Sequence, residues 1–210
     1  MLLIIFGVIT IAIAAFSMLA RENIKKLIAF SSVEHMGLIL LGIGLGTPVV
    51  LFWVLFHILG HALTKSLLFF SAGILRQQYH SNRYLDMKNV LALQPLASAG
   101  IIIGSVAVIG TPMFPLFLSK FYILSELAGF SGWLLFIVLL LLLMVAASFA
   151  LFMVRTFSQA GTDEAQVRYR ASLSMKFSII AQVGLLVALG VFFPLGLANM
   201  LKNIVASLGF

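Results

Sequence analysis

Long apolar runs, separated by short polar stretches, dominate the chain. Each run is close to or above the roughly 20 residues that an α-helix needs to cross a bilayer. Six spans are predicted: Met1 to Ala20, Leu27 to Gly46, Val49 to Leu75, Pro95 to about Ala128, Phe130 to Val154, and Lys176 to about Leu195, with a mildly apolar tail to Phe210. A membrane barrel needs short alternating strands instead. The pattern therefore predicts an all-α, polytopic membrane protein with about six transmembrane helices.

The fourth span is too long for one straight membrane helix, and its middle carries two prolines, Pro112 and Pro115, after Gly110. Proline removes a backbone donor and clashes with the preceding turn, so we expect this helix to be broken. Broken backbone at membrane depth is tolerated where protein or a watered cavity satisfies the freed groups, and such breaks often mark transport sites. A plain packing kink is the alternative interpretation.

Composition supports the membrane class and excludes several kinds of chemistry. The chain is 62% hydrophobic and only 9% charged, with a mean hydropathy of +1.19, whereas soluble domains are about 25% charged. It has no cysteine and only four histidines, so thiolate metal sites and iron–sulfur ligation are excluded within it. No phosphate loop, dinucleotide fingerprint or metal-ligand cluster is found, and we expect no cofactor, no metal and no redox chemistry in this chain.

Basic residues gather in alternate loops. The loops after the first, third and fifth spans carry ten of the thirteen lysines and arginines: Arg21, Lys25, Lys26, Arg76, Arg83, Lys88, Arg155, Arg168, Arg170 and Lys176. The loops after the second and fourth spans carry none. The positive-inside rule makes the basic side cytoplasmic, so both termini are expected outside. This topology explains the net charge of +7 better than nucleic-acid binding does.

Three ionisable side chains form one stripe on the third span. His57, His61 and Lys65 are spaced i, i+4 and i+8, which places them on one face of a helix. Lys65 lies near the bilayer centre, where a lysine costs roughly 2.5–3.5 kcal/mol on insertion scales. Burial disfavours the charged form of an amine and histidine titrates near neutral pH, so such a row can exchange protons. The alternative is a pair of hydrogen-bonded structural histidines, with Lys65 paired to a carboxylate.

Two further spans bury charge. Glu34 lies in the second span beside His35, and Ser31, Ser32 and His35 are candidates to hydrogen-bond it or to carry water. Its plainer role is a counter-ion for Lys65 or Lys120. Lys120 follows the break in the fourth span. Glu126 is expected near the outer end of that span, away from the Lys120 face, and His80 and Asp86 are expected to be solvated loop residues.

These same positions carry a resemblance to a known family. The run Asn23 to Gly37, NIKKLIAFSSVEHMG, resembles a signature of the antiporter-like subunits of respiratory complex I, Mrp-type antiporters and energy-converting hydrogenases. The run His61 to Gly73, HALTKSLLFFSAG, resembles the same family's lysine-bearing helix, and Gly110 to Lys120 resembles its broken helix. The Glu34-His35 pair is most similar to the hydrogenase branch, of the formate hydrogenlyase type.

The resemblance implies an organisation and a set of roles. Residues 1–154 would be the second of two inverted five-helix repeats, residues 155–175 a cytoplasmic loop, and residues 176–210 a C-terminal transmembrane helix and tail. Lys65 would be the central relay, with His61 beside it and His57 one turn further, and Lys120 the donor towards the exit. The family's first repeat, which begins the path, is missing from the chain; Met1 is compatible with a true start, a split gene or a truncation.

The function expected from these observations is proton translocation within a larger machine. The chain would be a membrane subunit, or the C-terminal half of one, of a redox-driven complex such as a membrane-bound hydrogenase or NADH:quinone oxidoreductase. Its partners would be other membrane subunits, the N-terminal half and lipid, in a prokaryotic inner membrane. A Mrp-type sodium/proton antiporter subunit and a non-transporting scaffold fragment remain the alternatives.

Overall fold

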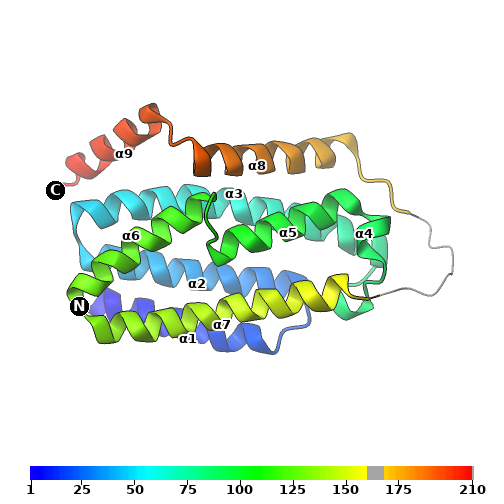
Figure 1. Ribbon diagram of the computed structural model, residues 1–210, viewed down its shortest axis with the longest axis horizontal. Helices are drawn as coiled ribbons and strands as arrows, with labels where there is room; N and C mark the ends of the chain where they lie inside the picture. Colours follow the sequence, from blue (N-terminus) through cyan, green and yellow to red (C-terminus); the bar gives the residue numbers. More distant parts are fainter. Residues whose placement is uncertain (160–167, 210) are drawn as a thin grey trace.

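The computed structural model describes residues 1–159 and 168–209, which fold into a bundle of long, roughly antiparallel helices (Figure 1). The helices are α1 (Leu2–Leu19), α2 (Ile24–Leu45), α3 (Pro48–Tyr79), α4 (Val90–Leu93), α5 (Pro95–Ile109), α6 (Pro115–Phe130), α7 (Gly132–Phe157), α8 (Leu173–Val191) and α9 (Leu195–Ser207), with a 3-10 turn at Tyr84–Asp86. Five of them, α1, α2, α3, α7 and α8, are long and apolar enough to cross a membrane. The all-α membrane prediction is therefore confirmed.

The fourth predicted span is two helices, α5 and α6, that follow one another across the bundle (Figure 1). Gly110 ends α5 in a left-handed conformation with φ 91°, which glycine adopts without steric cost. Met113 is also left-handed, with φ 80°, and a side chain there costs about 1–2 kcal/mol. Pro115 then starts α6 at a position where a proline N–H is not needed. The sequence correctly predicted the break.

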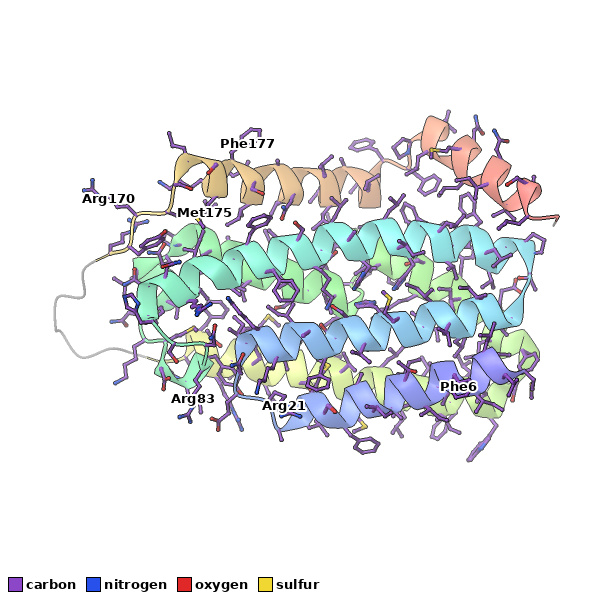
Figure 2. All side chains as sticks on the ribbon, turned by 180° about the vertical axis from the view of Figure 1, so that it is seen from behind. Phe6, Arg21, Arg83, Arg170, Met175 and Phe177 are labelled. Atoms are coloured by element: carbon purple, nitrogen blue, oxygen red, sulfur yellow. The ribbon has the colours of Figure 1, made fainter. Side chains whose placement is uncertain are left out.

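The ends of the bundle differ in charge. Arg83 and Arg170 lie at one end, with Arg21 on the same side of the molecule and Phe6 towards the other end (Figure 2). The N-terminus and α9 lie at the end opposite the basic loops (Figure 1). At the basic end, an isolated bridge pairs Asn23 with Arg83. The basic loops, which the sequence predicts on one side of the membrane, therefore lie at the same end of the bundle.

The first two helices approach each other closely because both carry glycine at the contact. A Cβ on Gly7 would come within 2.8 Å of the Gly37 carbonyl oxygen, and a Cβ on Gly37 would come within 2.7 Å of the Ile11 side chain. Lipid offers little hydrophobic force between helices, so small residues that allow close backbone contact are the usual means of association. This contact fixes α2, which carries Glu34 and His35.

The C-terminal part departs from the predicted boundaries. The sixth span was expected from Lys176 to about Leu195, but α8 begins at Leu173 and ends at Val191, and the predicted tail forms a second helix, α9, after Pro194. Gln182 of α8 donates to Ser66 Oγ of α3 over 2.9 Å. Gly190 sits so close to the break that a Cβ would lie 1.9 Å from the Met113 carbonyl oxygen. Helix α8 thus packs against the broken helix as well as α3.

Candidate functional site

The six ionisable residues singled out in the sequence meet between α2, α3 and α6. Glu34, His35 and His57 are fully buried, and Lys65 and Lys120 expose only 6% and 7% of their surface. His61 is half-buried. Neither lysine points into lipid. The geometry therefore brings together residues that lie up to about 85 positions apart in the chain.

Lys65 extends from α3 onto α2. Its ammonium donates to the Ile28 carbonyl over 3.1 Å and to the Ser31 hydroxyl. Ser31 and Ser32 both donate to the Ile28 carbonyl as well, over 2.9 and 3.4 Å. Neither serine hydrogen-bonds Glu34, because both hydroxyls turn back onto their own helix. Ser31 instead connects Lys65 to the α2 face on which Glu34 lies one turn further.

Lys120 is held by the break itself. In an unbroken helix the Val108 carbonyl would accept from the N–H of residue 112, but Pro112 has none. The Lys120 ammonium donates to that freed Val108 oxygen over 3.0 Å and lies 3.3 Å from Glu34 Oε1. The C-terminal end of α5 carries partial negative charge that favours a cation. Two parts of the same broken helix therefore supply the acceptor and the amine.

A chain of close polar contacts leads from Glu34 through two histidines to a serine. His35 Nε2 lies 3.5 Å from Glu34 Oε2, His35 Nδ1 is 2.9 Å from His57 Nε2, and His57 Nδ1 is 2.8 Å from Ser119 Oγ. His61 is the third histidine of the group, with its ring 5.0 Å from that of His35. Each ring nitrogen can either donate or accept, depending on the tautomer.

The serine at the end of this chain can set the direction of its hydrogen bonds. When Ser119 Oγ donates to the Leu116 carbonyl oxygen, 3.1 Å away, it accepts from an Nδ1–H of His57. His57 Nε2 then accepts from the Nδ1–H of His35. With both rings neutral, His35 Nε2 presents a lone pair towards the Glu34 carboxylate. In that arrangement a proton on either atom would join His35 Nε2 to Glu34 Oε2, which are 3.5 Å apart.

Sequence reasoning missed the role of Ser119 in this arrangement. Ser119 is completely buried, and it directly precedes Lys120, so that α6 presents a hydroxyl and an amine side by side. Trp53 of α3 stacks on Tyr122 of α6 with ring centroids 4.1 Å apart, which fixes the rotation of α6.

The remaining candidates lie away from this group. Glu126 is half-buried at the opposite end of α6, where its Oε2 accepts from the Thr47 hydroxyl over 3.3 Å. Asp86 accepts from Ser81 in the exposed loop after α3, and His80 ends α3, exposed to solvent. Within residues 1–159 and 168–209, no group of three or more His, Asp or Glu side chains is placed to hold a metal ion.

Comparison with known proteins agrees with this arrangement of helices. The family model described as NADH:quinone oxidoreductase/Mrp antiporter, TM, matches residues 1–146, well over half of the chain. The chain belongs to this family. A hydrogenase-4 component F homolog of Methylacidiphilum infernorum is 34% identical over 125 residues, which cover 60% of this chain and 26% of that protein.

Solved structures share the fold. A chain of the membrane-bound sulfane sulfur reductase, an archaeal respiratory membrane complex, superposes with a TM-score of 0.86 at 25% identity, covering 98% of this chain and 41% of that one. A chain of respiratory complex I from Thermus thermophilus gives 0.84 at 24% identity, covering 98% and 44%. The chain thus spans less than half the length of these relatives.

Proposed function

We propose that this chain carries part of a proton path in a redox-driven membrane complex, and that Glu34 is the junction of that path. The observation that carries the proposal is the position of Glu34: its two carboxylate oxygens face Lys120 at 3.3 Å and His35 at 3.5 Å. Both oxygens are buried and accept no regular hydrogen bond from the described residues. A carboxylate held this way can take or give a proton with little rearrangement.

The relay has three arms in this proposal. Lys65 exchanges protons with Glu34 by way of the Ser31 side of α2. Lys120 releases its proton beside the break, and the neutral amine then takes a proton from Glu34. The row His35–His57–Ser119 is the third arm, along which a proton can hop by tautomer exchange. His61 lies beside this junction and is a further group that can exchange protons with it. Gly110, Pro112 and Pro115 serve the path by freeing the carbonyl that holds Lys120.

The chain does not carry out redox chemistry in this proposal. It takes up the energy of a reaction catalysed elsewhere in an assembly of several membrane subunits, such as a hydrogenase or NADH:quinone oxidoreductase. The partners include a part equivalent to the remainder of its longer relatives, since the 125 matched residues cover 26% of the hydrogenase-4 homolog. The Glu34-His35 pair, which is most similar to the hydrogenase branch, assigns the chain to that branch in this proposal.

The same proposal sets the orientation in the membrane. We place the basic loops in the cytoplasm of a prokaryotic cell and both termini outside, because lysine and arginine are retained on the cytoplasmic side. Alkaline phosphatase fused after the last residue should be active and green fluorescent protein at the same position dark. The reverse pattern would contradict the orientation and would also exchange the entry and exit sides of the path.

Two other functions fit part of the observations. A sodium/proton antiporter subunit is favoured by the family description, which includes Mrp antiporters. A scaffold without transport would need the buried charges only for pairing, and Glu34 with Lys120 satisfies that. The three functions differ in what they require of Lys65, which donates to neutral oxygens and has no carboxylate within ion-pair distance among the described residues.

The experiment is proton uptake by proteoliposomes of the whole complex, with Lys65→Ala and Lys65→Arg compared at equal assembly. Lys65→Ala should abolish most proton transport while leaving partial electron transfer. Lys65→Arg should do almost as badly, because arginine keeps its proton at every working pH. If Lys65→Arg transports like the wild type, Lys65 is a structural cation, and the scaffold function replaces the relay. Uptake that depends on sodium would favour the antiporter.

A further inference from the structure

A cavity of about 630 Å³ opens at the basic end of the bundle, between α5, the end of α3 and the start of α8. Its wall combines charge with apolar surface. Three cations and several aliphatic side chains line it, among them Arg168, Arg170, Lys176, Ile74, Leu96 and Leu173. Figure 2 shows Arg170 at this end, next to the first turns of α8. The proton path does not use this cavity.

The wall that carries two of the cations is held in place. Gln78 Oε1 accepts from the Tyr169 N–H over 2.7 Å, and Gln94 Nε2 donates to the Tyr169 carbonyl over 2.8 Å. Gln94 exposes only 5% of its surface, and it also donates to Gln78 over 2.8 Å. Both backbone groups of Tyr169 are thus fixed by glutamines, and the arginines on either side of it are set at the cavity mouth.

The described residues that line this cavity do not balance its positive charge. Arg168, Arg170 and Lys176 form no ion pair within the described part of the chain, and no Asp or Glu is among the described lining residues. Three cations without an acidic side chain among the described lining residues favour an anionic ligand. Several phosphate oxygens can accept hydrogen bonds from two arginines and a lysine at once.

The position of the cavity indicates what kind of phosphate-bearing ligand it would bind. It lies at the end of the bundle where the membrane surface is expected, beside an α8 whose outer face is bare: Leu173, Phe177 and Ile180 expose 84%, 74% and 60% of their surface. Acyl chains can lie along that face while the headgroup reaches the cations. We propose that this cavity binds the headgroup of an anionic phospholipid.

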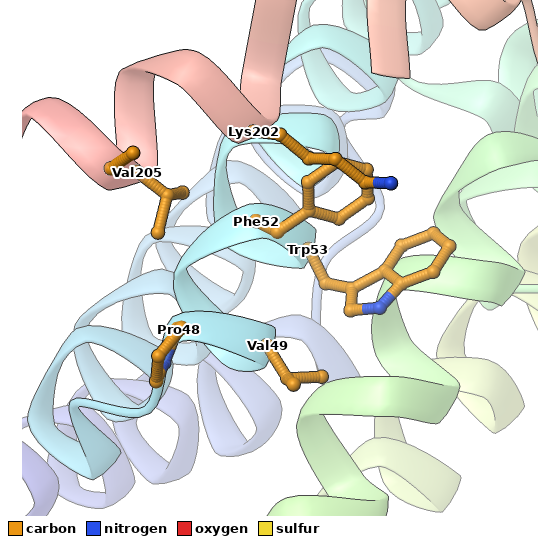
Figure 3. A pocket seen from close by; sticks show the side chains of 7 residues that line it. Pro48, Val49, Phe52, Trp53, Lys202 and Val205 are labelled. Atoms are coloured by element: carbon orange, nitrogen blue, oxygen red, sulfur yellow. The ribbon is translucent and has the colours of Figure 1, made fainter. Parts of the chain in front are cut away.

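A second cavity provides a contrast at the opposite end. It measures about 430 Å³ and lies between the start of α3 and α9, where Lys202 extends over Phe52 and Trp53 (Figure 3). Its described lining is otherwise apolar, with Lys202 as the one cation. This cavity offers contact area but little charge, so it should not distinguish an anionic lipid from a neutral one.

The test uses the protein purified with its co-purifying membrane subunits and reconstituted in nanodiscs of phosphatidylcholine with one-fifth phosphatidylglycerol. Lipids that survive detergent extraction are counted by native mass spectrometry. The wild type should retain phosphatidylglycerol over phosphatidylcholine by about tenfold beyond the nanodisc ratio. Arg168→Gln/Arg170→Gln/Lys176→Gln should remove this preference, and Arg170→Gln alone should lower it a few-fold.

The matched control removes the same number of charges from the same end but outside the cavity, as Lys25→Gln/Lys26→Gln/Arg155→Gln, and should retain the preference. An equal loss in the control would overturn the site in favour of a diffuse surface charge. Displacement of the lipid by millimolar inorganic phosphate alone would make it a soluble-phosphate site. A photo-crosslinker at position 170 that captures a protein subunit instead of lipid would make it a subunit interface.

Discussion

Two glutamates of α2 and its preceding loop form ion pairs of opposite character. Glu22 Oε2 accepts from Arg83 Nη2 over 2.7 Å, and both side chains are largely exposed, at 45% and 59%. Glu34 and Lys120 are farther apart, at 3.3 Å, but their side chains expose only 0% and 9%. Judged by distance alone, the exposed pair would be the stronger one.

The surroundings reverse that order. In water an exposed pair gains little, because both ions are already solvated and salt screens them. The carboxylate of Glu22 raises the pKa of Arg83, which leaves a guanidinium that was already charged at every working pH. Inside the bilayer each charge depends on the other, and removing one partner of a buried pair costs about 3–5 kcal/mol. The longer contact is therefore the one on which the molecule depends.

The largest expected effect comes from Glu34→Gln. Glutamine keeps the shape but cannot carry a proton, so proton uptake by the assembled complex should fall about a hundredfold. Glu22→Gln, the matched change on the exposed pair, should leave uptake unchanged. Both are measured in proteoliposomes at equal assembly. Wild-type uptake in Glu34→Gln would show that Glu34 is a counter-ion and not a junction.

A double variant separates pairing from proton transfer. Lys120→Gln alone should destabilise the protein by about 3–5 kcal/mol, because Glu34 is left buried and unpaired. Glu34→Gln/Lys120→Gln removes both charges and should recover most of that stability, measured as the unfolding midpoint in mixed micelles. Proton uptake should stay as low as in Glu34→Gln. Recovery of uptake together with stability would mean that the pair serves only the fold.

The smallest expected effect comes from Ser119→Ala. Without the hydroxyl, His57 loses the acceptor that fixes its tautomer, and the preferred direction of the histidine row is lost. Proton uptake should fall only about threefold, because water can take the place of one hydroxyl. The hydrogen/deuterium isotope effect on proton uptake should also change. Ser148→Ala, a similar change in α7, serves as control. An unaltered isotope effect in Ser119→Ala would exclude this role.

The membrane fold could be predicted well from the sequence because its causes are local. Helix length follows from the thickness of the hydrocarbon core, and the break follows from Pro112 and Pro115. The boundaries of α8 and the helix α9 were missed, since a mildly apolar tail becomes a helix only by packing: Leu201 and Val205 of α9 are buried in the bundle.

The candidate site was found in part. The spacing of His57, His61 and Lys65 on one helix indicated a stripe, and the stripe does face α2. That Glu34 pairs with Lys120 in preference to Lys65 could not be derived, because the sequence leaves the rotation of α6 against α2 undetermined. Ser119 was missed for the same reason, because its role depends on its contact with His57 of α3, which the sequence does not show.

By itself, the sequence determined that the protein spans a membrane, which end of it is basic, which helix is broken and which charges are buried. These properties depend on the composition of single segments and on the cost of placing each residue in lipid. Only the tertiary structure decided which buried groups touch. The amine of Lys120 meets the carbonyl freed by Pro112 because the first turns of α6 lie beside the end of α5, and contacts between helices depend on packing that no single segment encodes.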